Sequence, residues 1–423
     1  MEQMEKRERV ELTVSGESST ASESVTVTPL CPYFGRCGGC SAQHIAYATQ
    51  VKNKQKLVAV AAGIPPDKLE QVEVFAGEPY FYRNRMDFIF HKNGIGLRKA
   101  ERWQDIVDIE ACVISDKLLN TLIAEIRTFF LRETNNNIDA FEQKRLAGTF
   151  KYAVIRTPSI SGASSISFVL NTQSTRIDEA TKLIERFAKE TTAQSVLVAY
   201  VEKERDMALS EDFVVVKGSD MIREIICGKE LIYSTQAFFQ NNSKMAEKMV
   251  EYVRAVIESH PNHQNCNLLD LYGGVGTFGI CIADIVKSTH IVESSQQAID
   301  AANHNIAENY KNDPQKKKNI SAQVLDAMQV KKLATKPQMA APLIVITDPP
   351  RSGMHQKAIE ALNVTLAPEL LIYISCNPQQ LEKELPRFTN YTIERVAMFD
   401  LFPQTNHAEA VVVLKKNLST PQS

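Results

Sequence analysis

The chain has 423 residues, of which 44% are hydrophobic and 23% charged, and its formal net charge is -2. This length allows two or three domains with separate cores, while the near-neutral charge excludes nucleic-acid binding through overall charge alone. No apolar run approaches the roughly 20 residues that cross a bilayer, and no signal-peptide core is found near the start, so we expect a cytoplasmic protein. The eight cysteines are then not a disulfide framework.

Composition and hydrophobic pattern divide the chain into four parts, the last of which is residues 237–423. Residues 1–28 are rich in Ser, Thr and Glu and predict a flexible tail. Residues 29–70 hold a cysteine cluster and then a helical pattern that ends before Pro65. Residues 71–236 are rich in strands with interspersed helices, which predicts a central α+β domain whose sheet is covered on one face.

The cysteine cluster has the spacing Cys31-x5-Cys37-x2-Cys40, and Cys112 follows some 70 residues later. Four thiolates bind either zinc or a [4Fe–4S] cluster, and the number of ligands does not distinguish them. Zinc sites more often show two Cys-x2-Cys pairs, so the three-plus-one arrangement favours iron and sulfur.

Two nearby segments of the central region, residues 80–85 and 96–99, together combine basic and aromatic residues. Such a mixture suits phosphate contacts and base stacking, as in an RNA-binding surface. The alternative is an ordinary solvated strand face.

From residue 237 to the end, strands and helices alternate, which predicts a doubly wound α/β sheet. Its last two strands, near 391–399 and 409–415, are separated by a short loop, so one of them should be antiparallel.

A strand at 267–271 runs into the glycine-rich turn Tyr272-Gly273-Gly274-Val275-Gly276, and Glu293 ends the next strand. Glycines let a ligand approach the backbone, and an acid at that strand end suits a ribose diol. NAD and S-adenosylmethionine both carry this ribose. The irregular spacing of the glycines favours S-adenosylmethionine, whose sulfonium would favour a nearby acid such as Asp270; a tight turn without a ligand is the alternative.

Three further residues stand at strand ends of this region. Asp348 begins an Asp-Pro-Pro turn, and Cys376 ends the buried strand Leu371-Ile372-Tyr373-Ile374-Ser375. Glu409 begins an apolar strand, where partial burial would raise its pKa and make it a proton acceptor, with His407 as the competing base. Taken singly, each residue has an alternative without a catalytic role. Cys376 could be a core thiol, Asp348 part of a stiff turn, and Glu409 a solvated acid.

Together these motifs resemble the RNA uracil-C5 methyltransferases, and the amino-terminal cysteines resemble the iron–sulfur branch of that family that makes 5-methyluridine in 23S ribosomal RNA. The matching segments are residues 236–240, 270–276, 348–353, 375–378 and 407–409. The resemblance implies a class I, Rossmann-like methyltransferase domain at 237–423, an RNA-binding central domain and an amino-terminal iron–sulfur segment.

The resemblance also implies roles for individual residues. Cys376 would attack C6 of uracil, which makes C5 nucleophilic, and Glu409 would remove the C5 proton. A target base in structured RNA would have to be flipped out to reach Cys376. The implied [4Fe–4S] ligands are Cys31, Cys37, Cys40 and Cys112, and the implied S-adenosylmethionine contacts are Gln240, Tyr272, Gly274, Thr277, Glu293, Asp326 and Asp348.

The chain departs from the ribosomal branch at its amino terminus, where too few residues precede Cys31 for the small β-barrel often found there. We expect a monomer acting on 23S ribosomal RNA, with the T-loop uridine of transfer RNA as the second candidate. Two other classes are weighed against this enzyme: a non-catalytic iron–sulfur RNA-binding protein and an NAD-dependent oxidoreductase.

Overall fold

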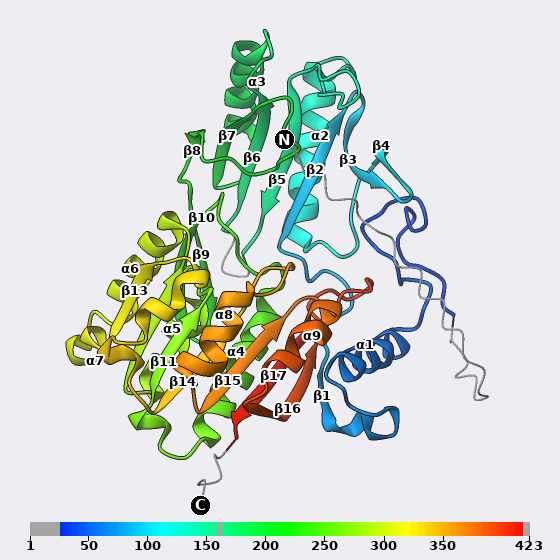
Figure 1. Cartoon of the computed structure of the whole chain (residues 1–423). Helices are drawn as coiled ribbons and strands as arrows, with labels where there is room; N and C mark the ends of the chain where they lie inside the picture. Colours follow the sequence, from blue (N-terminus) through cyan, green and yellow to red (C-terminus); the bar gives the residue numbers. More distant parts are fainter. Residues whose placement is uncertain (1–25, 159–162, 418–423) are drawn as a thin grey trace, which may run out of the picture.

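The structure is a computed structural model that describes residues 26–158 and 163–417 (Figure 1). Most of the predicted tail, 1–28, lies outside the described residues. Two large sheets dominate the molecule, the lower one in Figure 1 built mainly from the carboxyl-terminal half of the chain and the upper one from the middle. No helix in the described ranges is long and apolar enough to cross a membrane.

The lower sheet has eight strands and the winding predicted for residues 237–423. In spatial order they are β1 (Val72–Phe75), β16 (Tyr391–Phe399), β17 (Glu409–Lys416), β15 (Leu370–Ser375), β14 (Leu343–Thr347), β11 (Asn267–Leu271), β12 (Ser288–Glu293) and β13 (Ile320–Val324). Only β17 is antiparallel to its neighbours, which confirms the prediction for the last two strands. The chain order reverses between β11 and β14, and ligands bind at such a switch point in open α/β sheets.

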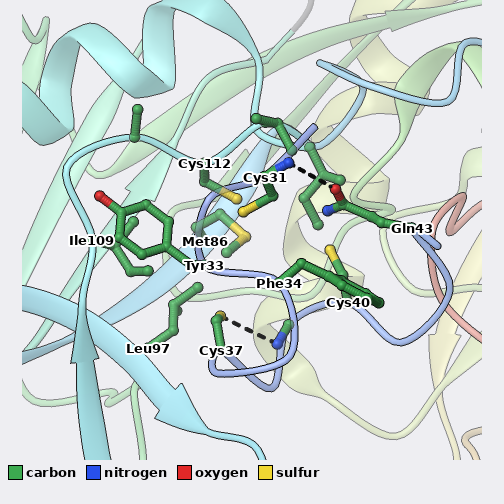
Figure 2. A pocket seen from close by; sticks show the side chains of 14 residues that line it. Cys31, Tyr33, Phe34, Cys37, Cys40, Gln43, Met86, Leu97, Ile109 and Cys112 are labelled. Carbon is green, nitrogen blue, oxygen red and sulfur yellow. Dashed lines mark hydrogen bonds between the residues drawn. The ribbon is translucent and has the colours of Figure 1, made fainter. Parts of the chain in front are cut away.

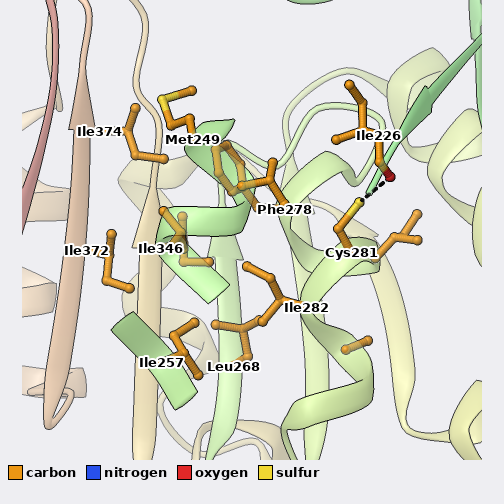
Figure 3. Packing of buried hydrophobic residues seen from close by; sticks show 14 of the residues in the cluster. Ile226, Met249, Ile257, Leu268, Phe278, Cys281, Ile282, Ile346, Ile372 and Ile374 are labelled. Carbon is orange, nitrogen blue, oxygen red and sulfur yellow. Dashed lines mark hydrogen bonds between the residues drawn. The ribbon is translucent and has the colours of Figure 1, made fainter. Parts of the chain in front are cut away.

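Alternate residues of these strands enter two different cores, as the two-residue period of a strand requires. Leu268, Ile346 and Ile372 face one core, which Figure 3 shows packed against Met249 and Phe278. The helices on this side are α4 (Ser243–Ser259), α5 (Thr277–Ile282) and α6 (Gln296–Asn309), with the hairpin of β9 (Met221–Ile226) and β10 (Lys229–Ser234).

The opposite face of the same sheet carries Leu269, Val345 and Leu371. It is covered by α1 (Tyr47–Ala61), α8 (Gln356–Glu360) and α9 (Pro378–Glu384), together with the 3-10 turn Ala327–Leu333. The short helix α7 (Pro314–Lys318) lies before β13, at the far edge. The sheet is thus buried on both faces, which explains the nearly continuous apolar sequences of its central strands.

The upper sheet has seven strands and is the α+β arrangement expected for the middle of the chain. In order they are β4 (Arg102–Asp108), β3 (Gly94–Lys99), β2 (Arg85–His91), β5 (Phe150–Arg156), β6 (Ser165–Asn171), β7 (Ser195–Val201) and β8 (Phe213–Lys217). One face packs on α2 (Lys117–Glu133) and α3 (Ile177–Glu190) around a cluster of phenylalanines, as predicted. The other face has only a small apolar cluster around Tyr152 and Val169.

One boundary of the sequence analysis is wrong. Residues 72–75, assigned to the central domain, form β1, which pairs in parallel with β16 and extends the lower sheet. Val72 is 2% exposed and packs with α1 against that sheet. A four-residue strand has no sequence feature that says which sheet it joins. The helix α1, which precedes β1 in the chain, packs against the same sheet and so holds β1 beside it.

Candidate active site

Three strand ends bring Asp348, Cys376 and Glu409 to one edge of the lower sheet. The parallel strands β14 and β15 are in register, with Thr347 beside Tyr373. The residues that follow the two strands therefore lie at the same edge of the sheet. The antiparallel β17 begins at the same edge, with Ala410 opposite Ser375. The direction of β17 therefore places Glu409 near Cys376, although 33 residues separate them.

The electrostatics of this edge are dominated by buried acids. Burial raises the pKa of the Cys376 thiol to about 12, with further contributions from the negative charges of Glu409 and Asp348. Glu409 is 3% exposed, and burial together with Asp348 raises the pKa of its carboxyl well above the usual range. Burial and the neighbouring Asp270 likewise raise the pKa of Asp348 to about 7. Carboxylates with a raised pKa are stronger proton acceptors than solvated carboxylates.

Arg351 is a site residue that the sequence analysis did not select. Its guanidinium lowers the pKa values of Cys376 and Glu409, against the effect of burial. Its Nη2 donates to Nδ1 of His407 at 3.2 Å, and the Asn377 side chain donates to its carbonyl at 3.0 Å. Its place directly after the Asp-Pro-Pro turn was the available signal.

His407, the competing base, is less suited to that role. Burial lowers the pKa of its ring, and Arg351 lowers it further. The Arg351 contact also requires Nδ1 to be an acceptor, so the imidazole is neutral there.

The glycine-rich turn after β11 has the backbone shape of a ligand-binding loop. Tyr272, Gly274 and Gly276 have φ values of 63, 53 and 90°. Asp270 supports the turn from below, because its Oδ2 accepts the Gly279 N–H at 2.8 Å. Burial raises the pKa of Asp270 to about 7, and Glu293 adds to the effect.

Other predicted cofactor residues surround this turn. Glu293 at the end of β12 accepts the Gly274 N–H at 3.3 Å, which joins two of them directly. Burial raises the pKa of Tyr272 to about 12, and the nearby charges of Asp326 and Glu293 contribute. Thr277 is the half-buried first residue of α5.

Two predicted residues have structural contacts of their own. Asp326 accepts the Met328 N–H at 2.8 Å and so begins a 3-10 turn. Gln240 lies between β10 and α4, where its carbonyl accepts from the Asn84 side chain of the upper part at 3.3 Å. Its described contacts link the two sheets rather than reaching the glycine-rich turn.

The four predicted cysteine ligands line one pocket of about 20 Å³ (Figure 2). Burial raises the pKa of Cys37 to about 11 and that of Cys40 to about 12, and the neighbouring Cys112 adds to both. The Gly39 N–H donates to the Cys37 sulfur at 3.4 Å, and Asn120 of α2 accepts the Cys112 N–H at 2.7 Å. Within the described ranges, however, no three His, Cys, Asp or Glu side chains have the spacing to hold a single metal ion.

Four thiols in an apolar pocket, two of them buried and two half-buried, are a donor set that suits a soft metal centre.

Residues 46–417 match the family described as tRNA (Uracil-5-)-methyltransferase. The chain belongs to this family. It is 30% identical over 399 residues to a protein named "Uncharacterized RNA methyltransferase TTE1797" from Caldanaerobacter subterraneus subsp. tengcongensis, a match covering 92% of this chain and 84% of that protein. It is 28% identical to the tRNA (uracil(54)-C(5))-methyltransferase of Pyrococcus furiosus, over 93% of this chain and 87% of the relative.

A solved structure agrees with the fold. The Pyrococcus abyssi tRNA (uracil-54, C5)-methyltransferase, in complex with S-adenosyl-L-homocysteine, superposes with a TM-score of 0.71 at 27% identity, covering 89% of this chain and 86% of that one. The chain is therefore an S-adenosylmethionine-dependent enzyme that methylates C5 of uracil in RNA. The non-catalytic and NAD-dependent alternatives are set aside.

Proposed function

We propose that Cys376 is the nucleophile and Glu409 the base of this methylation. The observation that supports it is the meeting of a half-buried thiol and a buried carboxyl at one sheet edge, next to the turn that would hold the methyl donor. Arg351 assists by its positive charge, which makes loss of the thiol proton easier.

The proposed steps balance as follows. The Cys376 thiol first loses its proton to solvent. Its sulfur then adds to C6 of the flipped uracil as a thiolate, and the electron pair of the C5–C6 double bond becomes part of an enolate. C5 then takes the methyl group from the sulfonium and leaves S-adenosylhomocysteine. Glu409 removes the C5 proton, whose electron pair restores the double bond and expels the thiolate.

The methyl donor is proposed to lie over the turn after β11. Glu293 is placed for the ribose hydroxyls, Tyr272 and Asp326 for the adenine end, and Asp348 for the region between donor and uracil. Gly274 allows close approach of the backbone to the donor. Thr277 and Gln240 are the two remaining predicted donor contacts.

We also propose that Cys31, Cys37, Cys40 and Cys112 hold a [4Fe–4S] cluster. When bound, the cluster would join the amino-terminal loop to the upper sheet, and no step of methyl transfer passes through it. The support is the shared pocket of four thiols and the three-plus-one spacing. Iron and acid-labile sulfide in the purified protein would test it, with zinc as the competing result.

The proposed substrate is the T-loop uridine of transfer RNA, because the relatives whose names include a substrate act on uridine 54 of tRNA. A uridine of 23S ribosomal RNA is the second candidate, favoured by the resemblance of the cysteine spacing. The two RNAs require the same chemistry at Cys376, so only the binding surface separates them.

The test is incubation with S-adenosylmethionine and RNA that carries 5-fluorouridine. Fluorine at C5 does not leave as a cation, so a covalent complex should accumulate on wild-type protein and be absent for Cys376→Ala. Transcripts of tRNA and of 23S fragments are compared side by side. If wild-type protein forms no complex with either RNA, the covalent mechanism is wrong; a complex with 23S fragments alone would overturn the choice of transfer RNA.

A further inference from the structure

A groove of about 490 Å³ lies between residues 31–41, which we call the cysteine loop, and the hairpin of β3 and β4. We call it the hairpin groove; it is lined by Phe34, Gly35, Cys37, Gly38, Cys40, Ser41, Arg98, Lys99, Ala100, Glu101 and Trp103. Its two walls are joined by backbone hydrogen bonds, from Gly38 N–H to the Arg98 carbonyl at 2.9 Å and from Ala100 N–H to the Arg36 carbonyl at 2.8 Å. Because backbone fixes both walls, the groove keeps its shape without a ligand.

Trp103 is the most unusual side chain of this groove. It is the single tryptophan of the chain, and its side chain is 53% exposed at the start of β4. Arg98 holds the indole: its guanidinium carbon lies 5.3 Å from the ring centre, and Nη1 donates to the Trp103 carbonyl at 2.7 Å. An exposed aromatic ring held in one orientation is a stacking platform for a base.

Arg98 is itself fixed by the upper sheet. Its Nη2 donates to Oδ2 of Asp206 at 2.6 Å and to the Tyr152 hydroxyl at 3.2 Å. The charge of Arg98 is therefore largely neutralised by Asp206, and the contribution of Arg98 to the groove is to position Trp103. Lys99 is the basic lining residue left to meet a phosphate, while Glu101 is the acidic one.

The groove is connected to the active site through the segment that precedes β17. The N–H groups of Ser41 and Ala42 both donate to the Gln404 carbonyl, at 3.0 and 3.1 Å. Ser41 lines the groove, and Gln404 precedes Glu409 by five residues in the chain. One wall of the groove is therefore anchored to the segment that leads to Glu409.

We infer that the hairpin groove binds an unpaired nucleotide of the substrate RNA near the target uridine, with its base stacked on Trp103 and its phosphate beside Lys99. This inference rests on the proposed function, since it takes the RNA of that reaction as the occupant. Stacking is tolerant of base identity, so the groove adds affinity and register rather than sequence choice.

The single tryptophan makes a direct test possible, because all indole emission reports on this site. Titration of wild-type protein with an unmodified tRNA transcript, and separately with a 23S fragment, should quench the emission in step with binding followed by anisotropy of labelled RNA. S-adenosylmethionine alone should leave the emission nearly unchanged. If RNA saturates the protein and the emission does not change, the inference is wrong.

Substitutions test the same contact by affinity. Trp103→Leu should weaken RNA binding by roughly 5- to 150-fold, because a stacked base contributes about 1–3 kcal/mol. Trp103→Phe should recover most of that loss, and Lys99→Gln should lower the salt dependence of binding by about one phosphate contact. The matched control Lys318→Gln, on α7 at the far edge of the lower sheet, should bind RNA like wild type.

S-adenosylmethionine affinity and the thermal midpoint show whether a variant is folded. A folded Trp103→Leu protein that binds RNA like wild type would overturn the inference. The two proposals fail separately: a covalent 5-fluorouridine complex without a change in emission removes the groove and keeps the mechanism. Quenching without any covalent complex removes the mechanism and keeps the groove.

Discussion

At the scale of single residues, the thiol of the proposed nucleophile, Cys376, is protonated in the protein without RNA. The pKa of Cys376 near 12 means that few molecules carry the thiolate at neutral pH. The causes are burial and the negative charges of Glu409 and Asp348. Removing either charge should therefore lower the thiol pKa and make the thiol more reactive toward electrophiles. This restraint suits an enzyme whose thiol should attack only a uracil that is already in place.

Replacing Glu409 with Gln should therefore speed alkylation of Cys376 by iodoacetamide at alkaline pH, above the raised pKa at which the Glu409 carboxyl becomes anionic. Loss of that negative charge lowers the thiol pKa, and the thiolate fraction rises by about tenfold for each unit of that fall. The measurement is the modification rate of the peptide carrying Cys376, followed by mass spectrometry in the absence of RNA. Glu394→Gln, an exposed position on β16, serves as control, and equal rates in the two variants would contradict the prediction.

Binding of S-adenosylmethionine should tighten as the pH rises from about 6 to about 8. The pKa values of Asp270 and Asp348, both about 7, are raised, so these carboxyls are largely neutral below this range and become anionic across it. An anion near the sulfonium strengthens binding of the cation. Calorimetry over this range checks the slope, and S-adenosylhomocysteine, which lacks the positive charge, should show a weaker one; identical slopes would refute the explanation.

At the scale of elements, α1 holds the segment that leads to Glu409. Lys54 of α1 is 4% exposed and its Nζ donates to Oδ1 of Asp400 at 2.6 Å, in a pair where Asp400 is fully buried. Gln50, one turn earlier, donates to the Gln404 side chain at 2.9 Å. A helix near the amino terminus thus fixes the approach to the last strand of the catalytic sheet.

Lys54→Ala should lower the free energy of unfolding by about 3–5 kcal/mol, because it leaves the Asp400 carboxylate buried without its partner. Urea denaturation followed by circular dichroism measures the loss. The control is Lys56→Ala on the exposed side of the same helix, expected within about 0.5 kcal/mol of wild type. Equal stability of the two variants would show that the buried pair is unimportant.

At the scale of the whole molecule, the cysteine loop connects the two sheets. It pairs with the β3–β4 hairpin of the upper sheet through Cys37 and Lys99, and with the lower part through Ser41 and Gln404. A cluster bound there would stabilise this connection, since a metal centre bound only by the folded state contributes its binding energy to folding.

Cys112→Ser should accordingly reduce the iron content of the purified protein and make residues 29–45 more sensitive to limited proteolysis. RNA affinity should fall with it, while the affinity for S-adenosylmethionine should stay the same, because the proposed donor site over the turn after β11 shares no residue with the lining of the cysteine pocket. Cys227→Ser, a half-buried cysteine outside the pocket, is the matched control. Wild-type iron content in Cys112→Ser would contradict the ligand set.

Local patterns were sufficient for much of this molecule. The strand at 267–271 has the predicted bounds, and the strand predicted to end at Ser375 ends there. Both are short apolar segments that end at polar turns, so their sequence carries these limits. The same holds for the glycine-rich turn, for Cys376 and for the three clustered cysteines, since each is a contiguous motif. The four-residue strand β1 lacks such a motif. Arg351 lies in one, directly after the Asp-Pro-Pro turn, but its contacts with His407 and Cys376 depend on segments distant in the chain.

By itself, then, the sequence determined which side chains end each strand, because strand ends are local events set by apolar runs and turn residues. Only the tertiary structure decided which of these ends meet. The reversed direction of β17 brings Glu409 to Cys376, burial between two helical layers raises the pKa of its carboxyl, and α1 joins β1 to the catalytic sheet. Proximity and burial are properties of packing, and packing arises from contacts between segments that no single stretch of chain contains.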